Sequence, residues 1–111
     1  TLAELFSYAA REYARPDALN YKKGDVWHSI SSKEMLSRAT NIALGLHSIG
    51  IGRGDRAALL AANSPEWTLC DAGCQFAGVV DVPIYTTLAS QSVKYIIRDS
   101  GARVFFIQNQ E

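Results

Sequence analysis

Short apolar runs alternate with helical patterns from residue 56 onward, and this alternation limits the possible folds more than any other feature of the chain. We predict strands over residues 56–62, 79–84 and 103–108, because each run is short and dominated by apolar side chains. Helical patterns over residues 65–77 and 90–100 separate these strands. A β-α-β-α-β order with continuously apolar strands predicts a parallel sheet with right-handed crossovers and helices on both faces.

The first 30 residues predict a helix followed by a β-hairpin. Apolar residues recur with helical spacing on one face of the segment 2–13. They are Leu2, Leu5, Phe6, Ala9, Ala10 and Tyr13. Two partly alternating runs, residues 18–22 and 26–29, flank the turn Lys23-Gly24-Asp25, which indicates a β-hairpin.

A longer helix follows the hairpin. Ser31 and Glu34 have the spacing of a capping box, in which the hydroxyl and the carboxylate each accept a backbone N–H at the helix start. An apolar stripe then runs from Met35 to Ile49. Gly50 is placed to end this helix, because glycine adopts the left-handed conformation of a helix terminus without strain.

The two later helices also carry start signals. Asn63 or Ser64 can cap the helix that begins near Pro65, and Ser90 or Ser92 opens the last helix. Small residues form one face of the earlier helix, and they are Cys70, Gly73, Cys74 and Ala77. Such a face allows a helix to lie close against a sheet.

Together these elements predict an α/β fold: a partial, doubly wound, mostly parallel sheet with flanking helices, preceded by a helix and a β-hairpin. The last strand is very apolar, and no later segment covers it before Glu111. We therefore expect residues 1–111 to be part of a larger domain. An uncovered strand edge of this kind also predicts self-association by edge pairing.

Composition excludes several classes of protein. The chain has 11 Lys and Arg against 11 Asp and Glu, for a formal net charge of +0, which argues against binding to nucleic acid. No apolar run approaches the roughly 20 residues of a transmembrane helix, and the first residues do not resemble a secretory signal. The two cysteines, Cys70 and Cys74, form neither a disulfide framework nor a zinc-binding pattern. A cytoplasmic location is therefore expected.

The glycine cluster at residues 50–55 does not predict a phosphate loop. A phosphate loop needs a strand before its glycines and a helix N-terminus after them, and the order here is reversed. Cys70 and Cys74 are interpreted as packing residues. His28 and His47 have no acidic partner in the pattern, so neither is assigned a catalytic role.

Topology selects the best candidates for ligand contact. Ligands of open α/β sheets gather beyond the carboxyl ends of the strands, which here means residues 63–66 and 83–87. Both segments also have a structural explanation, as a helix cap and as a strand terminus, and we rank that explanation first. Within the second segment, Tyr85, Thr86 and Thr87 are the candidates for a substrate pocket.

Several stretches, in their order, resemble the amino-terminal part of AMP-forming acyl-CoA synthetases of the adenylate-forming ligase superfamily. They are Ser31-Ser32-Lys33-Glu34-Met35 through Gly50, Gly54-Asp55-Arg56-Ala57-Ala58-Leu59-Leu60, Asn63-Ser64-Pro65-Glu66-Trp67, Val82-Pro83-Ile84-Tyr85 and Asp99-Ser100-Gly101-Ala102. Within that superfamily, residues 82–87 and 90–102 are most similar to long-chain fatty acid CoA ligases.

This resemblance implies an intact enzyme that uses ATP and Mg²⁺ to convert a fatty acid to an acyl-adenylate, from which coenzyme A displaces AMP. The superfamily's phosphate loop, acidic nucleotide motifs and late lysine have no counterpart in residues 1–111. No catalytic, cofactor-binding or metal-binding residue is therefore assigned, and the chain alone is expected to be inactive and to bind no cofactor.

Two alternatives stay open at this point. The first is another adenylate-forming enzyme, either an aryl-CoA ligase or a peptide-synthetase adenylation domain, because the acid-binding pocket lies outside this chain. The second is a free-standing, non-catalytic α/β module for binding or assembly. Such a module needs a partner or a second copy to cover its last strand.

Overall fold

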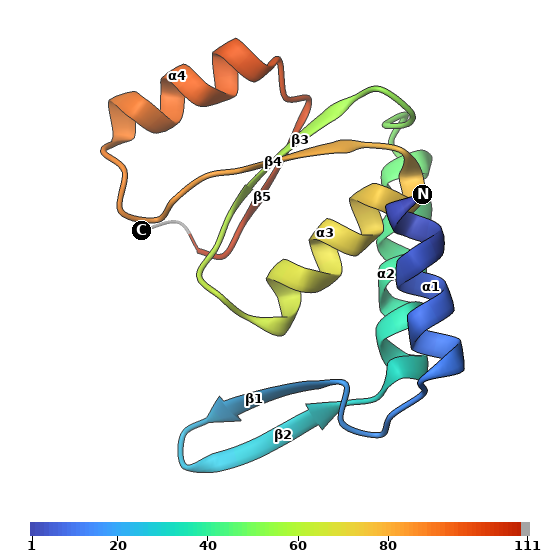
Figure 1. Ribbon diagram of the computed structural model, residues 1–111. Coiled ribbons are helices and arrows are strands. Elements are labelled where there is room, and N and C mark those ends of the chain that lie inside the picture. The colour runs from blue at the N-terminus through green and yellow to red at the C-terminus, as the bar shows by residue number, and fades with distance from the viewer. Residues whose placement is uncertain (110–111) are drawn as a thin grey trace.

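A computed structural model describes residues 1–109 as four helices and five strands (Figure 1). In chain order they are α1 (Leu2–Glu12), β1 (Leu19–Lys23), β2 (Val26–Ile30), α2 (Ser32–Ser48), β3 (Arg56–Leu60), α3 (Pro65–Ala77), β4 (Val80–Pro83), α4 (Ser90–Ser100) and β5 (Val104–Ile107). Every predicted element is present, and the three predicted sheet strands are shorter than their apolar runs. No helix within residues 1–109 is long and apolar enough to cross a bilayer.

The sheet has the order β4-β3-β5, with both strand pairs parallel. Its central strand is the most buried element of the chain, since Ala57, Ala58 and Leu59 are at most 2% exposed. Strands β1 and β2 form a separate antiparallel hairpin, in which Leu19 lies opposite Ile30. The predicted α/β class, parallel sheet and hairpin are confirmed.

The chain reverses its direction across the sheet after β4, because β4 pairs with one side of β3 and β5 with the other. With right-handed crossovers this reversal sends α3 and α4 to opposite faces of the sheet, as Figure 1 shows. The two faces are not equally covered. Helix α4 contains no buried residue, and Val80, Phe105 and Ile107 remain 53%, 37% and 52% exposed. The expected covering of both faces is therefore only partly met.

Helices α2 and α3 pack closely through a glycine. A Cβ atom added to Gly73 would lie 2.5 Å from Cγ2 of Ile42 and 3.1 Å from the carbonyl oxygen of Ala39. The small-residue face of α3 was expected to approach the sheet, and at Gly73 it approaches α2 instead. Cys74, one residue later, joins Leu46 of α2 in the buried core.

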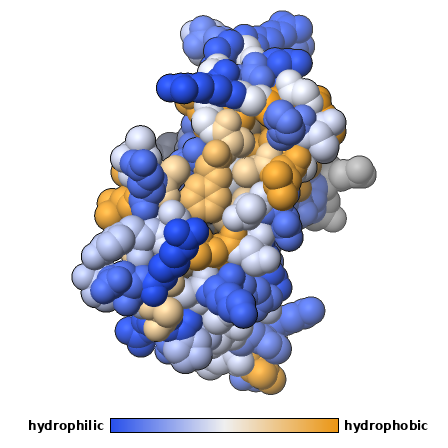
Figure 2. Space-filling view, turned by 90° about the vertical axis from the view of Figure 1, so that its right-hand side faces the viewer, coloured by the Kyte–Doolittle hydropathy of each residue, from blue (hydrophilic) through white to orange (hydrophobic). Residues whose placement is uncertain are grey.

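The apolar face of α1 does not point into the core. Of the positions that the sequence pattern groups together, only Ala10 is buried and Phe6 is half-buried, while Leu2, Leu5 and Tyr13 are 70%, 60% and 68% exposed. The reason is that α1 packs against α2 and α3 through the side that holds Ala10 and Phe6, so the other apolar positions lie outside this contact. Figure 2 shows hydrophobic side chains across the middle of the face on which α1 and α2 lie.

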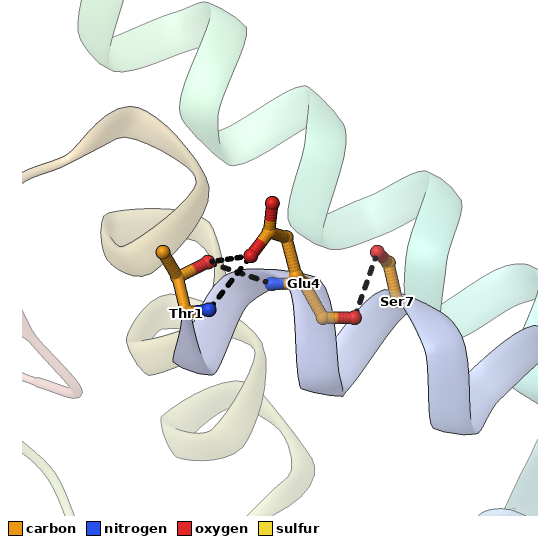
Figure 3. A network of polar contacts seen from close by, with 3 residues as sticks. All are labelled: Thr1, Glu4 and Ser7. Carbon is orange, nitrogen blue, oxygen red and sulfur yellow. Dashed lines mark hydrogen bonds and ion pairs between the residues drawn. The ribbon is translucent and has the colours of Figure 1, made fainter.

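The capping box occurs at α1 and only half of one at α2. The Thr1 hydroxyl accepts the N–H of Glu4 at 3.2 Å. The Glu4 carboxylate in turn accepts hydrogen bonds from the Thr1 amino group and hydroxyl, and the Ser7 hydroxyl donates to the Glu4 carbonyl oxygen (Figure 3). Ser31 accepts the N–H of Glu34 at 3.1 Å as predicted. The Glu34 carboxylate, however, pairs with Arg38 one turn later, so the predicted reciprocal bond is wrong.

The other helix ends resolve the alternatives left by the sequence. Ser64, not Asn63, caps α3 by accepting the N–H of Trp67 at 3.3 Å. Helix α4 begins at Ser90, one of the two predicted first residues, and its N-cap Ala89 makes no side-chain cap. Gly50 follows α2 with φ +80°, which confirms its predicted left-handed conformation.

Candidate functional site

The reversal of winding creates a crevice beyond the carboxyl ends of β3 and β5. In doubly wound sheets, ligands bind at this point, because the helices that follow the strands leave toward opposite faces and do not fill it. A cavity of about 480 Å³ lies there. Its lining residues are Leu59, Ala61, Ser64, Glu66, Trp67, Cys70, Phe106, Ile107 and Gln108. We call this the switch-point cavity.

The wall of the switch-point cavity is mostly apolar. Leu59 and Phe106 are register partners on β3 and β5, so their side chains lie on the same face of the sheet. Trp67 and Cys70 are three residues apart near the start of α3, and both are half-buried. An apolar wall with a few polar groups at its rim is typical of a small-molecule site.

Gln108 connects the two strands at the rim. Its backbone N–H donates to the Leu60 carbonyl oxygen at 3.2 Å, and its side-chain oxygen Oε1 accepts the N–H of Ala62 at 2.9 Å. Ser64 completes the rim, where its hydroxyl donates to the Ala62 carbonyl oxygen at 3.1 Å while it caps α3. These bonds fix the loop after β3 against the end of β5.

The cysteines are not suited to nucleophilic chemistry. Burial, with the Glu66 carboxylate as a smaller cause, raises the pKa of Cys70 above its usual value. Burial, followed by the nearby Asp81 carboxylate, raises the pKa of Cys74 to about 12. Both thiols are therefore protonated at neutral pH, whereas a reactive cysteine needs its thiolate. The lining of the switch-point cavity can bind an apolar group, and it offers no activated nucleophile.

Of the three candidates that the sequence suggested, only Thr86 lines an adjoining hollow. A cavity of about 250 Å³ shares Ala61, Ile107 and Gln108 with the switch-point cavity, and Thr86 is part of its lining. Tyr85 is 81% exposed. Thr87 is exposed and lines neither cavity.

The sequence reasoning missed most of the residues that line the switch-point cavity. It named residues 63–66, which include Ser64 and Glu66 of the lining, and residues 83–87 after β4, whereas the cavity is also lined by the ends of β3 and β5 and by the first turns of α3. Cys70 was interpreted as a packing residue, and Trp67 and Phe106 were not among the candidates for ligand contact. The available signal was their spacing, because Trp67 and Cys70 occupy one helix face directly after a strand.

The glycine cluster at residues 50–55 is a structural turn at the amino end of β3, opposite the end at which the switch-point cavity lies. The Asp55 carboxylate accepts the N–H of Gly52 at 2.9 Å and the Arg103 guanidinium at 3.0 Å, and these bonds, in that order, lower the pKa of Asp55. The backbone amides of the glycine cluster thus stabilise the turn between α2 and β3 and do not converge on an anion. Among residues 1–109, no group of three His, Cys, Asp or Glu is placed to hold a metal ion.

Comparisons with known proteins agree with this architecture. The profile of the AMP-binding enzyme family matches residues 6–111. Long-chain-fatty-acid–CoA ligase ACSBG2 of Xenopus laevis is 32% identical over 111 residues, which are 100% of this chain and 15% of that protein. Long-chain-fatty-acid–CoA ligase FadD15 of Mycobacterium bovis is 34% identical over 95 residues, which are 84% of this chain and 16% of that protein.

A solved structure gives the same result. The fatty acyl CoA synthetase of Mycobacterium tuberculosis superposes with a TM-score of 0.78 at 31% identity, covering 93% of this chain and 20% of that chain. The chain therefore spans only about 15% of the length of the curated relatives that it matches over its whole length. Because the family profile covers almost every residue, the chain belongs to the AMP-binding enzyme family.

Proposed function

We propose that this chain is the amino-terminal part of the large domain of a long-chain fatty acid–CoA ligase. The intact enzyme would use ATP and Mg²⁺ to join a fatty acid carboxylate to AMP with release of pyrophosphate, and coenzyme A would then displace AMP to form the thioester. One observation carries the proposal: relatives named as long-chain-fatty-acid–CoA ligases match all 111 residues at 32–33% identity.

The residues described here do not fit ATP or Mg²⁺. In the glycine turn the Gly52 amide donates to the Asp55 carboxylate, the Gly50 and Gly54 amides donate to backbone carbonyl oxygens, and no cluster of metal ligands occurs within residues 1–109. Groups that hold the nucleotide and the metal therefore belong, in this proposal, to the rest of the enzyme. The present residues contribute the β4-β3-β5 sheet and the switch-point cavity, whose apolar wall suits an acyl chain better than a phosphate.

The decisive experiment compares the intact parent protein with the 111-residue chain. We expect the parent to catalyse pyrophosphate–ATP exchange with palmitate and to form palmitoyl-CoA. We expect neither activity from the 111-residue chain. Exchange by the parent with benzoate or an amino acid, and not with palmitate, would refute the fatty acid assignment. Formation of acyl-AMP by the chain alone would refute the proposal that the groups that hold the nucleotide and the metal belong to the rest of the enzyme.

The loop after β4 is proposed to contact the substrate in the intact enzyme. Thr86 lines the smaller cavity, so Thr86→Val should raise KM for palmitate in the parent, and Tyr85→Ala should do the same if the exposed ring meets the acyl chain. Thr87→Val is the matched control, because Thr87 lines neither cavity. Equal kinetics for all three variants would exclude a pocket role for the loop.

A cytoplasmic location, where ATP and coenzyme A are available, belongs to the same proposal.

A further inference from the structure

A second groove lies on the other side of the molecule, between α1 and α2. It encloses about 570 Å³. Its lining residues are Ser7, Arg11, Leu36, Thr40, Ala43, Leu44, His47, Ile51, Gly52, Arg53, Phe76 and Ala77. We call it the α1–α2 groove. It shares no lining residue with the switch-point cavity.

Helix α2 presents different faces to the core and to the groove. Ala39 and Leu46 are buried on the core face. Leu36, Leu44 and His47 follow the same helical spacing on the face that lines the groove. Leu44 is 61% exposed there, so an apolar side chain stands uncovered on the wall of a hollow.

The floor of the α1–α2 groove is apolar as well. It comes from the end of α3, where Phe76 meets the ring of Phe6 edge-on at a centroid distance of 5.6 Å. The buried Ile51 adds to the lining below the last turn of α2. An elongated apolar group could therefore contact apolar side chains along both the wall and the floor of the groove.

Positive charge in the groove is not balanced by any acidic residue of the lining. Arg11, His47 and Arg53 all line it, and within residues 1–109 none of them takes part in an ion pair. Three other arginines of the described chain are paired with carboxylates. The chain as a whole has a formal net charge of +0, so the two arginines give the groove a local excess of positive charge.

The positions of these groups define the length of the groove. Leu36 and His47 are eleven residues apart on α2, which corresponds to about 16 Å along the helix. Helices α1 and α2 run antiparallel in Figure 1, so Arg11, near the end of α1, lies toward the start of α2, while Arg53 follows the end of α2. The groove thus carries cations at both ends and apolar side chains between them.

We propose that the α1–α2 groove binds an amphiphilic anion, with its head group at His47 and Arg53 and its apolar chain along Leu44 and Phe76. The volume of the groove is in the range of small-molecule sites, which run from about 300 to 1,000 Å³. Charge complementarity selects an anion over a neutral lipid, and the apolar wall selects an amphiphile over a free inorganic anion.

The test is a titration of the ¹⁵N-labelled 111-residue chain followed by amide chemical shifts. The ligands are decanoate, decyl phosphate, decanol and inorganic phosphate, each below its aggregation concentration. We expect the two amphiphilic anions to shift amides of residues 7–11 and 43–53 at the lowest concentrations. The tighter of the two identifies the head group as a carboxylate or a phosphate. Decanol and inorganic phosphate should need at least about fivefold higher concentrations, since each lacks one of the two interactions.

Variants distinguish specific binding in the α1–α2 groove from nonspecific adsorption of the amphiphile to the protein surface. Arg53→Gln should weaken decanoate binding by about two- to fivefold, the range expected for an exposed ion pair, whereas Arg11→Gln, at the other end of the groove, should weaken it less. Arg98→Gln on α4 is the matched control and should leave binding unchanged. Dispersed spectra establish that each variant is folded.

Three results would overturn the inference. They are equal binding of decanol and decanoate, binding that is unaffected by Arg53→Gln, and shifts confined to residues 59–70 and 104–108 around the switch-point cavity. The titration contains neither ATP nor coenzyme A. Its outcome is therefore independent of whether the parent protein is a ligase.

Discussion

Two glycines in neighbouring helices provide a measurement of how closely α2 and α3 pack. Gly45 lies in α2, and a Cβ added there would meet no atom within 4 Å. Gly73 lies in α3, where an added Cβ would be 2.5 Å from Cγ2 and 2.7 Å from Cβ of Ile42. Alanine at either position gives the same gain in helix propensity, so the difference between the two variants isolates the packing.

The magnitudes decide the sign of each effect. Alanine is better than glycine inside a helix by about 0.8–1.0 kcal/mol, so Gly45→Ala should stabilise the fold by roughly that amount. Overpacking a tight contact costs about 1–3 kcal/mol. The upper part of this range applies to Gly73, because the β-branched Ile42 has little rotamer freedom in a helix and the Ala39 carbonyl oxygen belongs to the backbone. Gly73→Ala should therefore destabilise the fold by about 1–2 kcal/mol net.

Urea denaturation followed by far-UV circular dichroism measures both changes. The midpoint should rise for Gly45→Ala and fall for Gly73→Ala with the slope m unchanged, and the two free energies of unfolding should differ by about 2–3 kcal/mol. If Gly73→Ala stabilises the chain as much as Gly45→Ala does, the two helices are not held at this separation. The account of the core given above would then be wrong.

Three further perturbations test other parts of the fold. Ser64→Ala should cost about 1 kcal/mol of unfolding free energy through the lost cap, while Asn63→Ala should change little; equal losses in urea titrations would contradict the cap assignment. Burial and the adjacent Asp71 carboxyl raise the pKa of Asp81 to about 6, above its unfolded value of about 4. The folded chain therefore binds more protons between about pH 4 and 6, so stability should fall as pH rises through this window, and Asp81→Asn should flatten that slope. The open edge of β5 predicts concentration-dependent association in sedimentation experiments, and Ile107→Lys should abolish this association. A wild-type chain that stays monomeric at all concentrations would contradict edge pairing.

Much of the fold follows from local signals. The predicted helices and strands were found because apolar spacing, the cap at Ser31 and the stop at Gly50 all act within a few residues of one another. The limits of the strands were less accurate. β3 ends at Leu60, two residues before its apolar run does, because its partners β4 and β5 end at Pro83 and Ile107, opposite Leu59 and Leu60.

Features that depend on distant contacts were harder to predict. The apolar pattern of α1 identifies a helix correctly, but it does not say which side meets α2 and α3. The small residue Ala10 allows the closest approach, so it is buried while the larger Leu5 remains exposed. The α1–α2 groove has the same origin, because it lies between helices whose relative rotation no local pattern specifies.

The switch-point cavity depends on one choice, namely whether β5 pairs with β4 or with β3. The order β3-β4-β5 would wind in one direction and leave no crevice, whereas β4-β3-β5 reverses and opens one. The sequence contains a signal for this choice that the first interpretation used only to end a strand. Pro83 has no N–H to donate, and proline is confined to edge strands. Pro83 therefore favours an edge position for β4, and because β4 pairs with β3, which precedes it in the β-α-β unit, β3 then lies between β4 and β5, with the site at its carboxyl end.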